Sequence, residues 1–126
     1  MFEGAMFNTF KYVNSKCYIG SKLDSTFDDS GNEIKNYAKP KEYSFNIQPL
    51  SAASDIQDFG ENASKMKVAV ITNRPKYENK FKEFDCAYLD GATPEGETVN
   101  GQNANYRVYA VRPQNVVIRV FFMKIV

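Results

Sequence analysis

The fold is decided by residues 43–72, YSFNIQPLSAASDIQDFGENASKMKVAVIT, which have the pattern of a strand, a long connection and a second strand. Hydrophobic and polar side chains alternate at Tyr43, Phe45 and Ile47, and again from Met66 to Val70. This period of two is typical of strands that bury one face. The connection, residues 48–64, is much longer than the roughly 4–6 residues usual in a compact domain. A connection of this length is either functional or disordered.

Part of the connection has the pattern of a single helical turn. Ser54 and Gln57 have the spacing of a capping box, in which the Ser side chain caps the first turn. Gly60 stands where a glycine commonly ends a helix. Ile56 and Phe59 would share one face of the turn and fasten it to the surface beneath. We therefore predict a loop tethered at its middle, and we expect the rest of the domain to fold without residues 52–63.

The rest of the chain alternates short strand patterns with turn signals. Strand patterns lie at residues 7–18, 34–37, 84–89, 106–111 and 116–126. Asp, Ser, Gly and Asn at residues 28–32 predict a hairpin tip, because these residues favour turns. Residues 116–126 are hydrophobic on both faces, which indicates a central strand or one covered by a partner. We predict an all-β fold, a small antiparallel β-barrel or sandwich of about six to seven strands with a long inter-strand loop and one short helical turn.

Length and composition fit one domain. The 126 residues form a single domain on this prediction, with residues 1–6 as a flexible segment. No stretch has the basic start and apolar run of a signal peptide or approaches the ~20 apolar residues of a membrane span. We expect a soluble, intracellular protein whose two cysteines, Cys17 and Cys86, are reduced, with a disulfide between them as the alternative.

The residue types do not predict an enzyme. The chain has no His and no CxxC pair, which argues against a zinc site and excludes His-based catalysis. Asp55, Asp58 and Glu61 recur at a spacing of three, but no further ligand accompanies them. A solvated acidic loop or a salt-bridge patch on a neighbour explains them better. The acidic residues near Asp28 lack the spacing of a calcium loop. We expect no catalytic residue, no metal and no cofactor.

The charge is divided unevenly along the chain. Residues 1–63 hold 6 Lys and 9 Asp or Glu, whereas residues 64–126 hold 10 Lys or Arg and 6 Asp or Glu. Two such halves attract neighbouring copies head-to-tail unless they interleave in the fold. Candidates for contact with a DNA backbone or with a neighbouring subunit are Lys65, Lys67, Arg74, Lys76, Lys80 and Lys82. A solvated surface is the alternative, and a net charge of +1 argues against tight autonomous binding to DNA.

A second exposed loop is predicted over residues 91–105, which are rich in Gly, Asn and Glu. Its candidate partner-docking residues are Thr93, Glu95, Glu97, Asn100 and Asn103.

Several segments carry a resemblance to a known family. They are residues 29–32 (DSGN), 45–51 (FNIQPLS), 58–61 (DFGE), 84–91 (FDCAYLDG), 105–108 (NYRV) and 111–115 (VRPQN). With them the sequence resembles the head-closure (stopper) or head–tail joining connector proteins of tailed bacteriophages. None of the segments is a catalytic fingerprint, and the similarity is one of fold.

The resemblance implies a small β-barrel that assembles into a homo-oligomeric ring, twelve-fold by analogy, between the portal and adaptor above and the tail terminator or tail below. Such a ring lies in the neck of the virion and is assembled in the host cytoplasm. It extends the channel for double-stranded DNA without sequence-specific contacts, helps to retain the packaged genome and docks the tail, and no membrane is involved. In some members a long loop blocks the channel until infection. The matching candidate gating residues here are Leu50, Ser51, Ser54, Asp55, Ile56, Asp58, Phe59, Gly60 and Glu61.

Two other interpretations stay open at this point. The chain could be a tail terminator or another protein of the tail-tube end, built on a similar β-domain. It could also be a small β-barrel enzyme or ligand-binding protein, although the missing His and the missing acid pair argue against this.

Overall fold

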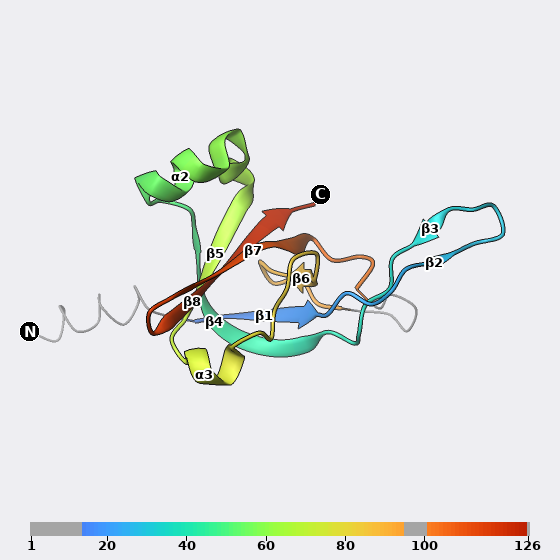
Figure 1. Ribbon diagram of the computed structural model, residues 1–126, viewed down its shortest axis with the longest axis horizontal. Coiled ribbons are helices and arrows are strands. Elements are labelled where there is room, and N and C mark those ends of the chain that lie inside the picture. The colour runs from blue at the N-terminus through green and yellow to red at the C-terminus, as the bar shows by residue number, and fades with distance from the viewer. Residues whose placement is uncertain (1–13, 95–100, 126) are drawn as a thin grey trace, which may run out of the picture.

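A computed structural model describes residues 14–94 and 101–125 (Figure 1). Six strands form a closed barrel in the order β1-β4-β5-β8-β7-β6, and each neighbouring pair is antiparallel. The strands are β1 (Ser15–Gly20), β4 (Lys41–Pro49), β5 (Met66–Ile71), β6 (Cys86–Tyr88), β7 (Tyr106–Gln114) and β8 (Val117–Lys124). The prediction of an all-β fold is therefore confirmed, and of the two alternatives the barrel is the one that forms.

Strand β4 changes partner along its length. Its first half pairs with β1, from Lys41 opposite Ile19 to Phe45 opposite Ser15. Its second half pairs with β5, from Asn46 opposite Val70. The two long strands predicted at either end of residues 43–72 are therefore neighbours in the barrel.

The barrel interior is filled by the inward side chains of all six strands. The core includes Phe45 from β4, Ile71 from β5 and Val108 from β7, each almost fully buried. The inward face of β8 adds a further branched and aromatic row, Ile118, Val120 and Phe122. Because successive strand residues point to opposite faces, the other hydrophobic side chains of β8 must be buried outside the barrel.

A second set of buried side chains, the outer cluster, lies on the outside of β5 and β8. It consists of Met66, Val68, Phe121 and Met123. A β-bulge in β7 lies between Val108 and Ala110, and it turns Tyr109 and Ala110 toward this cluster. The sequence pattern of residues 106–111 predicts Tyr106, Val108 and Ala110 on one face, and the bulge places Ala110 on the other. The outer face of β8 at Phe121 and Met123 is covered by other residues of the same chain.

That cover is the connection of residues 50–65. It forms α2 (Ala53–Phe59), continues as the 3-10 helix η1 (Gly60–Lys65) and lies above the barrel in Figure 1. The predicted loop is therefore a folded helical segment, longer than the single turn expected.

One further helix, α3 (Arg74–Tyr77), lies at the end of β5. Asn73 caps it by accepting a hydrogen bond from the amide of Lys76 at 3.4 Å. Tyr77 and Phe81 pack edge-on against Phe45, with ring centroids 5.2 and 5.9 Å away. The rings of Tyr77 and Phe81, which belong to the basic stretch of residues 74–82, thus pack against the core of the barrel.

A two-stranded hairpin extends away from the barrel between β1 and β4 (Figure 1). We call residues 21–38 the hairpin arm. Its strands are β2 (Thr26–Phe27) and β3 (Glu33–Ile34), and its base is joined by a bridge between Lys22 and Tyr37. The hairpin tip predicted at residues 28–32 is confirmed.

Strand boundaries differ from the sequence prediction at several ends. Within the described residues the first strand is Ser15–Gly20, and residues 7–13 of the predicted strand lie outside the described part, as do residues 1–6. The turn between the predicted strands at 106–111 and 116–126 is only Asn115 and Val116, because Gln114 still pairs with Val117.

Candidate functional site

The candidate gating segment, α2 with η1, is anchored on the outer cluster by Phe59. The ring of Phe59 lies 4.9 Å from that of Phe121 and 5.8 Å from that of Tyr109, measured between centroids. Leu50 packs against the same cluster, and Ala63 of η1 is buried. Burial of a large side chain contributes about 1.5–3 kcal/mol, so these contacts hold the segment in one place.

Two ion pairs add to this anchoring. Asp55 is only 3% exposed and accepts two hydrogen bonds from the guanidinium of Arg119 in β8, one of them at 3.1 Å. Asp58 accepts one from Arg112 in β7, also at 3.1 Å, in a much more exposed position. Both acidic residues therefore form salt bridges to the barrel of their own chain, a pairing that the sequence did not predict.

The predicted details of the helical turn are partly wrong. Ala52, not Ser54, is the N-cap, and no side chain caps the helix. Ile56 is 44% exposed, because Asp55 and Phe59, four residues apart, form the face toward the barrel. Gly60 does end α2, with a positive φ of 59°.

The remaining gating candidates lie at the surface. Ser51 and Ser54 are exposed, as is Glu61, whose carbonyl accepts a hydrogen bond from the hydroxyl of Ser64. No contact in the described residues fixes their side chains to the barrel.

The six basic candidates do not form one patch. Lys65 and Lys67 lie at the start of β5, and the other four follow the end of that strand. The six residues of β5 separate the two groups by roughly 20 Å. Lys67 pairs with Asp90, and Arg74 pairs with Glu78 at 3.0 Å. Lys82 is exposed.

Lys76 and Lys80 both lie close to one aromatic ring and form a local basic surface. Their ammonium groups lie 5.4 and 5.8 Å from the centroid of Tyr77. Neither forms an ion pair within residues 14–94 and 101–125. Phe81, in contrast, is buried, so its ring cannot stack on a nucleic-acid base.

The second predicted loop is only partly described. Thr93 is exposed, whereas Glu95, Glu97 and Asn100 lie outside the described residues. Asn103 accepts a hydrogen bond from the hydroxyl of Tyr88, so its side chain supports the fold.

Next to it, Asn105 supports the fold in a way that the sequence did not indicate. Its amide oxygen accepts from the backbone amide of Leu89 at 3.0 Å, and its amide nitrogen donates to the carbonyl of the same residue at 2.9 Å. The side chain thereby replaces a pair of strand hydrogen bonds.

The two thiols are suited to packing rather than to chemistry. Burial raises the pKa of the Cys17 thiol to about 12 and that of Cys86 to about 11, so both stay protonated at neutral pH. Both are free, as predicted. Among the described residues no group of three or more Cys, Asp or Glu could hold a metal ion, and no helix there is long and apolar enough to cross a membrane.

The base of the hairpin arm is tied to the loop before β6 by a buried carboxylate. Asp85 accepts hydrogen bonds from the backbone amides of Lys22 at 2.9 Å and Lys82 at 3.0 Å. Burial raises the pKa of Asp85, and the two amide hydrogen bonds oppose this shift. The arm therefore leaves the barrel from a fixed point.

The arm itself exposes hydrophobic surface. Phe27 is 67% exposed and Leu23 is 50% exposed. At the tip, the carboxylate of Asp28 accepts hydrogen bonds from the amides of Ser30 at 2.9 Å and Asn32 at 2.8 Å, which lowers the pKa of Asp28. The turn is therefore well formed, although nothing in the described residues covers its strands.

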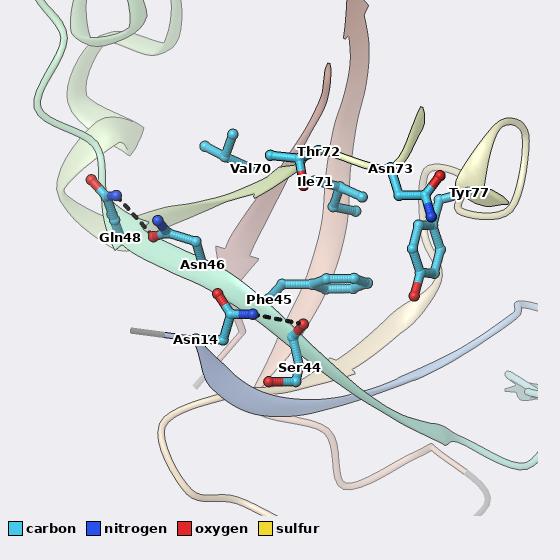
Figure 2. Close-up of a pocket in the computed structure, with 10 residues that line it drawn as sticks. All are labelled: Asn14, Ser44, Phe45, Asn46, Gln48, Val70, Ile71, Thr72, Asn73 and Tyr77. Atoms are coloured by element: carbon cyan, nitrogen blue, oxygen red, sulfur yellow. Dashed lines mark hydrogen bonds between the residues drawn. The ribbon is translucent and has the colours of Figure 1, made fainter. Parts of the chain in front are cut away.

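A groove opens on the barrel where β4 and β5 separate beyond the pairing of Asn46 with Val70 (Figure 2). Its volume is about 440 Å³. Phe45, Ile71 and Tyr77 supply its apolar side. The polar side chains are all neutral: Asn14, Ser44, Asn46, Gln48, Thr72 and Asn73.

Comparison with known proteins identifies a similar fold and no family. No protein-family model matches the chain, and no curated protein matches it. The chain is similar to the solution structure of protein SF1141 from Shigella flexneri 2a, a structural genomics target. The match has a TM-score of 0.57 at 10% identity and covers 90% of this chain and 94% of that one. At this identity the similarity shows the fold alone.

Sequence reasoning missed the partners that hold the helical segment and the role of the arm. Arg119 was visible as a charge that interrupts a hydrophobic strand, and a buried arginine requires a carboxylate partner. Phe27 stood beside a turn sequence, so its exposure was not evident from the chain.

Proposed function

We propose that this protein is a structural component of a bacteriophage neck, forming a ring below the portal and adaptor that extends the DNA channel, helps to retain the genome and docks the tail. The observation that carries the proposal is the hairpin arm, which extends from a closed barrel with Phe27 and Leu23 in solvent. An isolated two-stranded hairpin is marginally stable in water, so an arm of this kind gains its order from a partner.

Two further features support an assembly role over catalysis. Both thiols are buried with raised pKa values, so neither serves as a nucleophile. Among the described residues the interior of the barrel is filled by side chains, which argues against a ligand site inside it. The resemblance of the sequence to head–tail connector proteins then supplies the kind of assembly.

The helical segment fits this function better as a fixed wall or subunit contact than as a moving gate. Opening would require breaking the contact between Asp55 and Arg119 and exposing the outer cluster. The exposed residues Ser51, Ser54, Ile56 and Glu61 are the ones available to a neighbour or to the channel.

The test is removal of the chain from the phage that encodes it, followed by electron microscopy of the particles. The expected result is DNA-filled heads that lose their genome or lack tails. Normal tailed, DNA-filled particles would contradict the proposal. Co-purification of the tagged chain with the tail tube, and not with portal and adaptor, would assign it to the tail end instead.

A further inference from the structure

The hairpin arm and the β4–β5 groove lie at opposite ends of the same strands. Strand β1 runs into the arm and β4 runs out of it, whereas the groove is lined by Asn14 and, from β4, by Ser44, Phe45, Asn46 and Gln48. These residues of β4 lie three to seven positions after Lys41, or roughly 10–23 Å along the strand. The arm extends away from the barrel in Figure 1.

The charges of the two elements are complementary. Residues 23–34 of the arm carry Asp24, Asp28, Asp29 and Glu33 and no basic residue. The groove has no charged lining residue, and Lys76 and Lys80 lie beside its Tyr77. An acidic arm placed in the groove would therefore face neutral polar side chains and the ammonium groups of Lys76 and Lys80 at the edge. Among the described residues no carboxylate lines the groove to repel it.

The shapes of the two surfaces also correspond. On the arm, Phe27 stands opposite Glu33 in the pairing of β2 with β3, so one face presents an aromatic ring beside a carboxylate. In the groove, Phe45 and Ile71 form an apolar floor and Tyr77 lies at its side (Figure 2). The ammonium group of Lys76 lies 5.4 Å from the centroid of the Tyr77 ring. An aromatic anchor in a pocket with charged neighbours at the edge is the usual arrangement of a binding hot spot.

We propose that the hairpin arm of one copy docks into the β4–β5 groove of the next copy, with Phe27 on the apolar floor and the arm carboxylates against Lys76 and Lys80. Arm and groove are different surfaces, so the contact is head-to-tail and generates a ring if the rotation closes or a filament if it does not. This inference rests on the proposed function, because it names the contact between subunits of the ring.

The first experiment measures self-association of the full chain by analytical ultracentrifugation at protein concentrations up to about 1 mM. A Kd of about 1 mM corresponds to a binding free energy of about 4 kcal/mol. Phe27→Ser is expected to weaken association about tenfold or more, as a hot-spot truncation does. Ile125→Ser, at an exposed hydrophobic residue after β8, is the matched control and is expected to leave association unchanged. The melting temperature of Phe27→Ser should equal that of the wild type, because the arm lies outside the barrel core.

The second experiment exchanges charges and adds a covalent trap. Glu33→Lys and Lys76→Glu should each weaken association, and the two together should restore it. A chain with both Glu33→Cys and Thr72→Cys should form a ladder of disulfide-linked multimers on oxidation, whereas each single variant should form dimers at most. The native thiols are buried and stay silent in this assay.

Equal association of the Phe27 and Ile125 variants overturns the proposal, and so does an oxidised double-cysteine chain that stops at dimers. A wild-type chain that remains monomeric at about 1 mM overturns it as well. Each of these outcomes leaves the proposed function intact if the chain is still found in the neck of the particle by electron microscopy. Absence of the chain from the particle removes the proposed function itself.

Discussion

The contact between Asp55 and Arg119 provides the sharpest test of how the helical segment is held. In Asp55→Ala the guanidinium of Arg119, whose side chain is 20% exposed, loses its only anionic partner among the described residues. Breaking a buried ion pair from one side costs about 3–5 kcal/mol, and the partial exposure of Arg119 places this variant near 3 kcal/mol. Arg119→Met leaves the more deeply buried carboxylate unpaired, so its cost should be at least as large.

The structure also supplies a matched control. Asp58→Ala removes the other ion pair of α2, in which the side chains are 54% and 40% exposed. Exposed pairs contribute about 0–1 kcal/mol, so this variant should be nearly neutral. Both variants place Ala, the best helix former, in the same helix, and the lost charge of Asp55 near the helix start accounts for at most about 1 kcal/mol.

The assay is equilibrium unfolding in urea with the midpoint and slope fitted for each variant. A loss of about 3 kcal/mol corresponds to a fall in melting temperature of roughly 10–15 °C for a domain of this size. The double variant with Ala at 55 and Met at 119 should lose less than the two single losses combined, by about 1–3 kcal/mol. If Asp55→Ala and Asp58→Ala have the same stability, the ion pair does not anchor the segment.

Three further results are expected. Deleting residues 52–63 exposes the outer cluster at a cost on the order of 6–12 kcal/mol, which is comparable to the whole stability of a domain. Circular dichroism should therefore show an unfolded chain, whereas the sequence alone predicts that the domain still folds. Ionised Asp28 stabilises the tip of the arm, so the tip should be fully ordered above pH ~3.8 and should lose its order as the pH falls through the lowered pKa of Asp28. The NMR chemical shift of the Ser30 amide measures this change, and an unchanged shift down to pH 2 would contradict it. Cys17 and Cys86 should not react with Ellman's reagent in the folded protein and should react in urea; rapid labelling of the native chain would show that the barrel opens.

The amino-acid sequence by itself determined the strands and most of the turns. Alternation at Tyr43, Phe45 and Ile47 identified β4, and the turn residues at 28–32 identified the hairpin tip. These signals are local, because a strand that buries one face needs a hydrophobic residue at every second position and a tight turn needs Asx or Gly side chains. The hydrophobic residues on both faces of β8 predicted a central strand or one covered by a partner, without deciding between the two.

Only the tertiary structure decided what covers that face and what remains free. Asp55 looked like a solvated loop residue, and it became buried because β8 brings Arg119 beneath it from 64 residues away. Conversely, Phe27 stood beside a turn sequence that did not indicate its environment. It remained exposed because the arm leaves the barrel before another strand can cover it. Closure into a barrel depended on the pairing of β1 with β6, a contact between distant segments that no local pattern encodes. The candidate assembly surfaces follow from that closure, since it places the arm and the groove at opposite ends of the same strands.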